Sequence, residues 1–173
     1  MEISRIPPWT DDGNVNVVVE IPRGSMNKYE FDQELGVIKL DRVLYSAVHY
    51  PTEYGFVPCT KSGDGELQDV MVMVEQPTFP GCLVEVRLIG VLTIEHDSGT
   101  PERKLLGVPV MEPRFAEYRD IADVPQHLLK EMSNFFDVFK DLQETQVRSR
   151  EWQGADDARQ TLDEAVSAYR ENH

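Results

Sequence analysis

The sequence has little cysteine and no long apolar segment. Its two cysteines, Cys59 and Cys82, form no CxxC pair, so we expect two free thiols in a reducing compartment. No apolar run approaches the roughly 18 residues of a membrane-spanning helix. The N-terminal segment MEISRIPPWTDDG lacks the apolar core of a signal peptide. We therefore expect a cytoplasmic protein that does not enter a membrane.

Positive charge is also scarce. The chain carries 17 Lys and Arg residues against 31 Asp and Glu residues, for a net charge of −14. A nucleic-acid-binding surface needs clustered basic side chains to neutralise phosphates, so this balance argues against a nucleic-acid partner. The length of 173 residues and the 40% hydrophobic content are typical of one domain with a sizeable core, over residues 1–173.

The first two-thirds of the chain show the pattern of β-strands. Apolar residues alternate with others over 15–21, and Pro22 ends this strand. Further strands are expected over 28–31, 37–40, 69–74, 82–95 and 104–110. Short strands that are separated by Gly and Pro turns favour a closed antiparallel barrel.

The last third changes to the period of helices. Apolar residues from Leu128 to Leu142 are spaced by three and four, and Pro125 is a suitable first-turn residue. A second amphipathic helix is expected from Ala158 to Tyr169, after a polar segment near Gly154. The fold class predicted is therefore α+β, with a β-barrel and flanking C-terminal α-helices.

Two acidic, glycine-containing turns point to chemistry. The run SGDGELQDV contains Asp64, Glu66 and Asp69, and the turn EHDSGTPERK adds Asp97 and Glu102. Single acidic turns are more often surface features that bind nothing. If the two turns meet, however, their carboxylates repel one another unless a hard cation such as Mg²⁺ lies among them. Without metal, such crowding should raise some of their pKa values.

Basic residues on otherwise apolar elements could serve phosphate groups. Metal ions that bridge phosphate oxygens, together with Lys and Arg side chains, are what the hydrolysis of a phosphoanhydride requires. Singly, each basic residue is more often a solvated surface group, and Tyr50 and Tyr54 are more often packing aromatics. The basic residues in question are Lys28, Arg42, Lys104 and Lys140.

Several segments also occur in the order known from one protein family. They include VVVEIP, NKYEFD, LDRVLYSAVHYPTEYGFVP, DGELQDV and NFFDVFKDL. On these segments the chain resembles the soluble family I inorganic pyrophosphatases over nearly its whole length. The resemblance implies a five-stranded, OB-like barrel with flanking helices, and Mg²⁺-dependent hydrolysis of pyrophosphate to two phosphates. It further implies a homo-oligomer, a hexamer in the family's bacterial members.

The resemblance also assigns roles to residues. It implies that Asp69 touches two metal ions with the nucleophilic water between them, that Glu66 helps to deprotonate this water, and that Tyr54 orients groups near it. The implied catalytic residues are thus Glu66, Asp69 and Tyr54. The implied metal ligands are Asp64, Asp69, Glu102, Asp97 and Glu30. The implied substrate-binding residues are Lys28, Arg42, Tyr54, Lys104 and Lys140.

Three departures from the family pattern leave alternatives open. Glu66 replaces the middle Asp of the DGDPLDV signature, in which Leu67 and Gln68 replace the usual Pro and aliphatic residue. Glu102 replaces a metal-binding Asp, and Phe139 replaces the Tyr before the phosphate-binding Lys. One alternative is a relative with a different phospho-substrate or greatly reduced activity. Another is a non-catalytic binding module, because OB-like barrels often bind oligonucleotides. The preserved acidic charge favours metal binding.

Overall fold

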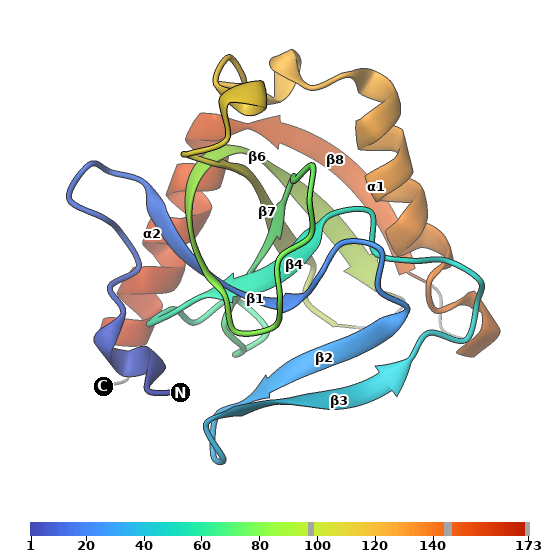
Figure 1. Ribbon diagram of the computed structural model, residues 1–173, viewed down its shortest axis with the longest axis horizontal. Helices are drawn as coiled ribbons and strands as arrows, with labels where there is room; N and C mark the ends of the chain where they lie inside the picture. Colours follow the sequence, from blue (N-terminus) through green and yellow to red (C-terminus); the bar gives the residue numbers. More distant parts are fainter. Residues whose placement is uncertain (97–98, 144–146, 172–173) are drawn as a thin grey trace.

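The structure is a computed structural model that describes residues 1–96, 99–143 and 147–171. One sheet contains β1 (Val15–Ile21), β4 (Glu53–Val57), β5 (Gln68–Val72), β6 (Leu83–His96), β7 (Glu102–Pro109) and β8 (Val147–Gly154). A separate hairpin consists of β2 (Asn27–Asp32) and β3 (Val37–Val43), which lie apart from the main sheet at the bottom of Figure 1. The α-helices are α1 (Gln126–Val138) and α2 (Ala155–Glu171), which lie on opposite sides of the molecule in Figure 1. Short 3-10 helices span Ile3–Arg5, Pro113–Phe115, Ile121–Asp123 and Asp141–Gln143.

The main sheet is mixed. Its strand order is β1-β4-β5-β7-β6-β8, and β1 also pairs with β6, so the pairings of five strands return to β1 while β8 adds a sixth strand beside β6. β5 and β7 run parallel, with Val70 opposite Leu105. The expectation of a purely antiparallel sheet is therefore wrong. The reason is that the chain reverses direction between β5 and β6 and again between β6 and β7. β7 therefore runs in the same direction as β5, beside which it lies.

β8 occupies the segment that the sequence predicted to be a polar break between helices. Its sequence, VRSREWQG, has few apolar residues, yet it pairs with β6 from Gly90↔Gly154 to His96↔Val147. Val147 is buried, and Trp152 Nε1 donates to Ser133 Oγ of α1 at 3.0 Å. Pairing and these two contacts, rather than amphipathic alternation, make this segment a strand.

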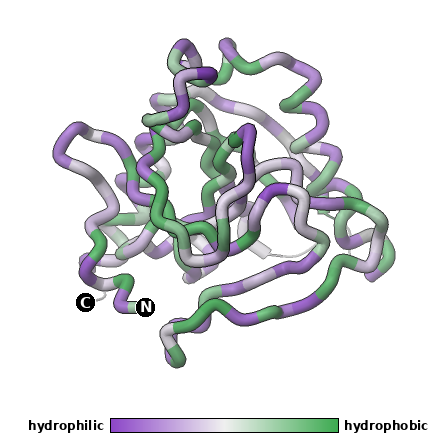
Figure 2. The backbone as a smooth tube through the Cα atoms, in the orientation of Figure 1, coloured by the Kyte–Doolittle hydropathy of each residue, from purple (hydrophilic) through white to green (hydrophobic). Residues whose placement is uncertain are grey.

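The two faces of the sheet are covered by different helices. One cluster joins Met71 of β5 to Phe135 and Phe136 of α1, whereas the other joins Val70 to Leu162 of α2. Adjacent residues of β5 thus enter different clusters, as the alternation of a strand requires. Figure 2 shows the hydrophobic residues concentrated along the strands of the main sheet.

The first predicted helix is shorter than expected. α1 ends at Val138, with Phe139 as its C-cap, and Leu142 lies in the following 3-10 helix with 64% of its surface exposed.

Among the described residues, no helix is long and apolar enough to span a bilayer.

Candidate active site

A cavity of about 220 Å³ brings together segments that are far apart in the chain. Its walls come from β1, β2, β4, the turn before β5, the strands β5, β6, β7 and β8, and the end of α1. Most of the residues that the sequence singled out line it: Lys28, Glu30, Tyr54, Asp64, Glu66, Asp69, Glu102, Lys104 and Lys140. Arg42 is not in this lining, and Asp97 lies outside the described residues.

Asp69, Glu102 and Lys104 form the centre of the cavity. Asp69 is the second residue of β5, and Glu102 begins β7 instead of lying in the preceding turn as expected. The Lys104 ammonium forms ion pairs with Asp69 Oδ2 and with Glu102 Oε2. Burial opposes the charge of Lys104, but the two carboxylates prevail and raise its pKa above the ordinary value.

Tyr54 supports Asp69 from β4. Its hydroxyl donates to Asp69 Oδ2 at 2.7 Å. Burial, reinforced by the charge of Asp69, raises the pKa of Tyr54 well above its ordinary value. The hydroxyl therefore stays protonated at neutral pH and remains a hydrogen-bond donor.

Glu102 has a second neighbour, His96, at the end of β6. His96 Nε2 lies 2.6 Å from Glu102 Oε1, outside the geometry of a hydrogen bond. Burial favours the neutral form of Glu102, but the Lys104 ammonium outweighs it and lowers the pKa of Glu102 below its usual value. The prediction was that crowding raises the pKa values of some of the acids. Glu102 is not one of them, because a lysine lies among the carboxylates.

The turn before β5 is held by its own side chains. Gly65 adopts a φ of 92°, a left-handed conformation that glycine adopts without strain. Asp64 Oδ1 accepts hydrogen bonds from the Ser62 hydroxyl and from the backbone N–H of Glu66, the latter at 3.0 Å. Asp64 and Glu66 are exposed to solvent at the edge of the cavity.

Glu20 also lines the cavity, although it was not among the predicted catalytic, metal-binding or substrate-binding residues. Its side chain is buried and accepts a hydrogen bond from the backbone N–H of Phe31 at 2.7 Å. Burial raises the pKa of Glu20 to about 8. The available signal was a single acidic residue in the apolar run VVVEIP. His96, which directly precedes the second acidic turn, was missed in the same way.

The basic residues lie around this centre. Lys28 and Arg42 face each other across the hairpin, and both contact Asp41 Oδ2, at 3.0 and 2.9 Å. Arg42 also donates to Gln143 Oε1 at 3.2 Å, so it is held outside the cavity wall. Burial lowers the pKa of Lys140, whose Nζ lies 5.3 Å from the centre of the Phe139 ring.

The donor atoms at the centre suit a hard cation. Within the three described ranges, no three His, Cys, Asp or Glu side chains converge as a preformed metal site. The central acceptors are nevertheless carboxylate oxygens, which divalent cations such as Mg²⁺ prefer. The Lys104 ammonium already lies against two of these carboxylates. The site therefore accommodates positive charge where Asp69 meets Glu102, and its residues fit a divalent cation.

Comparison with known proteins agrees with this chemistry. The family model for inorganic pyrophosphatase matches residues 17–170. The inorganic pyrophosphatase of Geobacillus stearothermophilus is 49% identical over 157 residues, which cover 91% of this chain and 94% of that protein. The enzyme of the same name from Nostoc sp. is 43% identical over 170 residues, covering 98% and 100%. The crystal structure of inorganic pyrophosphatase from Thermus thermophilus matches with a TM-score of 0.93 and 36% identity, covering 98% of this chain and 99% of that one. The chain therefore belongs to the inorganic pyrophosphatase family, as the order of its sequence segments predicted.

Proposed function

We propose that the protein hydrolyses inorganic pyrophosphate to two orthophosphates with the help of divalent cations, Mg²⁺ first among them. The observation that carries this proposal is the meeting of Asp69, Glu102 and Lys104 in a cavity that Lys28 and Lys140 also line. Acidic groups for cations and basic groups for phosphates are thus combined in one site.

The acidic residues are proposed as the cation ligands. Asp64, Asp69 and Glu102 would hold the first ion, and Glu30 and Asp97 would serve ions that arrive with the substrate, as the family resemblance implies. A bound divalent cation neutralises phosphate charge and lowers the pKa of a coordinated water toward about 7.

The remaining residues are proposed to orient groups and to bind phosphate. Tyr54 fixes one oxygen of Asp69 through its hydroxyl, and Glu66, exposed at the cavity edge, would accept a proton from the attacking water. Lys28, Lys104 and Lys140 would donate to phosphate oxygens inside the cavity. Arg42, which Asp41 and Gln143 hold outside the lining, would contact the substrate from the hairpin side.

Other expectations about the protein join this proposal. We infer that β1, β4, β5, β7 and β6 form the five-stranded OB-like barrel, which the return of their pairings to β1 supports. The single domain, the cytoplasmic location and the homo-oligomer, with a hexamer as its expected form, stay predictions. A different phospho-substrate is not favoured, because relatives that match over nine-tenths of the chain bear the pyrophosphatase name.

The test is phosphate release from pyrophosphate by the purified protein, with Mg²⁺ and with a chelator. We expect turnover that requires the cation and falls at least about 100-fold in Asp69→Asn. Asp163→Asn, at an exposed position of α2, is the matched control and should keep parental activity. Absence of release from folded protein in Mg²⁺, Mn²⁺, Co²⁺ and Zn²⁺ would refute the proposal. A panel of other phosphoanhydrides and phosphate esters tests the alternative substrate.

A further inference from the structure

Gln68 lies behind the centre of the site, where the sheet otherwise presents apolar side chains. It begins β5, and the residues that share its face by alternation, Val70 and Val72, pack in the cluster that α2 covers. Gln68 is only 2% exposed. A buried amide costs free energy unless it is hydrogen-bonded, so its partners indicate why it is there.

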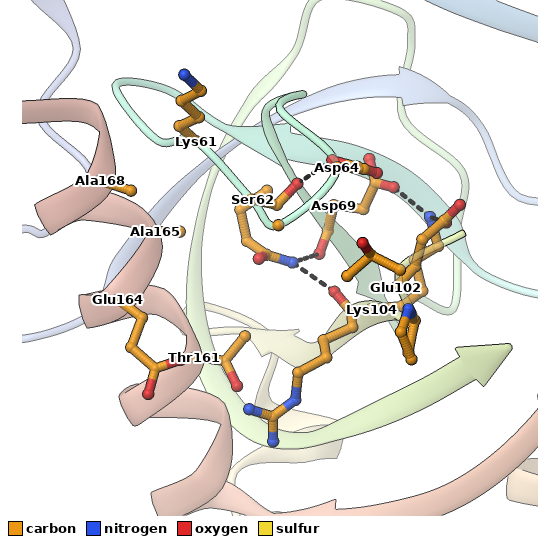
Figure 3. A pocket seen from close by; sticks show the side chains of 15 residues that line it. Lys61, Ser62, Asp64, Asp69, Glu102, Lys104, Thr161, Glu164, Ala165 and Ala168 are labelled. Atoms are coloured by element: carbon orange, nitrogen blue, oxygen red, sulfur yellow. Dashed lines mark hydrogen bonds and ion pairs between the residues drawn. The ribbon is translucent and has the colours of Figure 1, made fainter. Parts of the chain in front are cut away.

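The side-chain amide of Gln68 joins two strands. Its Nε2 donates to the backbone carbonyl of Asp69 at 3.1 Å and to that of Arg103 at 2.6 Å. Figure 3 shows this region from close by, with Asp69 and Lys104 labelled. The two hydrogens of one amide therefore connect the peptide group after Asp69 with the peptide group before Lys104.

These bonds extend the parallel pairing of β5 with β7. The paired residues run from Val70↔Leu105 to Val72↔Gly107, so Asp69 and Lys104 lie just before the paired region. Arg103 there borders a second cavity of about 350 Å³, which lies between this edge of the sheet and α2 and which Asp69 and Lys104 also line. Gln68 thus connects β5 with β7 just before their paired region begins, at the level of Asp69 and Lys104.

The neighbouring sequence gives a reason for such a connection. Leu67 and Gln68 stand where the family resemblance led us to expect Pro and an aliphatic residue. A proline fixes φ near −65°, and Leu67 lacks this restraint. A side-chain connection directly after Leu67 restrains the same stretch of backbone in another way.

We propose that Gln68 is a positioning residue. Its amide holds β5 and β7 together at the level of Asp69 and Lys104, and it thereby sets the spacing between the carboxylates of Asp69 and Glu102. This inference rests on the proposed function for its role in turnover, but its first consequence is the affinity of the site for Mg²⁺. Groups that orient metal ligands typically contribute 10- to 100-fold to metal affinity.

The experiment compares Gln68→Met with Thr161→Val. Methionine keeps the length of glutamine and removes both N–H donors. Thr161 borders the same second cavity, is buried, and donates to the Asp157 carbonyl at 2.8 Å, so Thr161→Val loses a buried hydrogen bond that involves none of the proposed site residues. Mg²⁺ affinity is measured by calorimetry without substrate, followed by kcat and KM for pyrophosphate.

We expect Gln68→Met to weaken Mg²⁺ binding about tenfold and to lower kcat by a similar factor, while Thr161→Val stays within about twofold of the parent. Gln68→Leu repeats the test with a strand-favouring side chain. Parental Mg²⁺ affinity in the folded Gln68 variants overturns the inference, whatever the melting temperature, and so does failure of both variants to fold. If the parent binds Mg²⁺ but does not hydrolyse pyrophosphate, the proposed function fails, whereas the calorimetric comparison still decides the role of Gln68.

Discussion

Lys104 and Asp69 form an ion pair across two parallel strands, although 35 residues separate them in the chain. Glu102, two residues before Lys104, contacts the same ammonium group. The single ammonium group of Lys104 therefore pairs with both carboxylates at the centre of the cavity. A divalent cation bound between these carboxylates, as proposed, would compete with Lys104, and this competition can be measured.

Replacement of Lys104 by Met should destabilise the protein when no divalent cation is present. The side chain is only 9% exposed, and removal of one partner of a buried ion pair costs about 3 kcal/mol because it leaves uncompensated charge. Mg²⁺ should then raise the free energy of unfolding more in Lys104→Met than in the parent, because it restores the missing positive charge. Urea unfolding with a chelator and with Mg²⁺ measures both effects.

Lys39→Met is the matched control for this experiment. Lys39 pairs with Asp32 at 2.7 Å, but its side chain is 51% exposed on the hairpin, and exposed ion pairs contribute little. Its removal should change neither stability nor the response to Mg²⁺. Equal stabilisation of the parent and Lys104→Met by Mg²⁺ would contradict the competition.

Removal of the Tyr54 hydroxyl should slow turnover more than it affects folding. The hydroxyl donates to Asp69, and hydrogen bonds to charged groups contribute about 1.5–3 kcal/mol. We expect kcat for Tyr54→Phe to fall about tenfold or more, with the fold retained. Steady-state kinetics and circular dichroism test this, with Tyr118→Phe, remote from the cavity, as the control. Unchanged kcat would mean that the hydroxyl does not orient Asp69.

The stability of the protein should depend on pH through Glu20. Its folded-state pKa of about 8 lies above the ordinary 4.5, so the native state holds the proton more tightly than the unfolded state. The resulting stability is fully present below pH 4.5 and is lost as the pH rises through about 8. Glu20→Gln should therefore match the parent at pH 4.5 and exceed its stability at pH 8.5.

Urea unfolding of the Glu20 pair at pH 4.5, 6.5 and 8.5 provides this comparison. Glu117→Gln, at an exposed position, controls for the removal of one negative charge and should follow the parent at each pH. A constant difference between Glu20→Gln and the parent across the three pH values would argue against a neutral Glu20 in the native state.

Restoration of the tyrosine that the family pattern has at position 139 should strengthen substrate binding. Phe139 lines the cavity beside Lys140, where a hydroxyl would reach substrate oxygens. We expect KM for pyrophosphate to fall about tenfold in Phe139→Tyr, with kcat little changed. Phe135→Tyr is the control, because Phe135 packs in the same core cluster but is not part of the cavity lining, so that its hydroxyl should lower the melting temperature instead. An unchanged KM in Phe139→Tyr would show that the hydroxyl makes no bond with the substrate.

Local patterns predicted those elements that have clear periodicity. β1 and α2 follow from alternating valines and from apolar residues at helical spacing, although the structure buries both faces of β1 and only one face of α2. β8 could not be predicted in this way, since only Val147 and Trp152 of its eight residues are large and apolar. Its partner β6 begins more than 60 residues earlier, and local periodicity carries no information about such a partner.

The site was predictable in composition but not in arrangement. The acidic turns and the basic residues were recognisable, and most of them line one cavity. The position of Lys104 among the carboxylates depends on the parallel pairing of β5 with β7, which the expected antiparallel sheet did not contain. Glu20 was overlooked as a site residue because its burial depends on the neighbouring hairpin, where Phe31 binds its carboxyl group.

The parallel contact between β5 and β7 also bears on how the chain folds. β6 and its flanking segments lie between β5 and β7 in the sequence, so the pairing of β5 with β7 closes a long loop. Closing this loop costs conformational entropy before the strand contacts can stabilise it. Asp69 cannot meet Lys104 until this loop has closed. Catalytic competence should therefore emerge late during refolding, after the hairpins and helices have formed, so that recovery of activity reports the completion of folding.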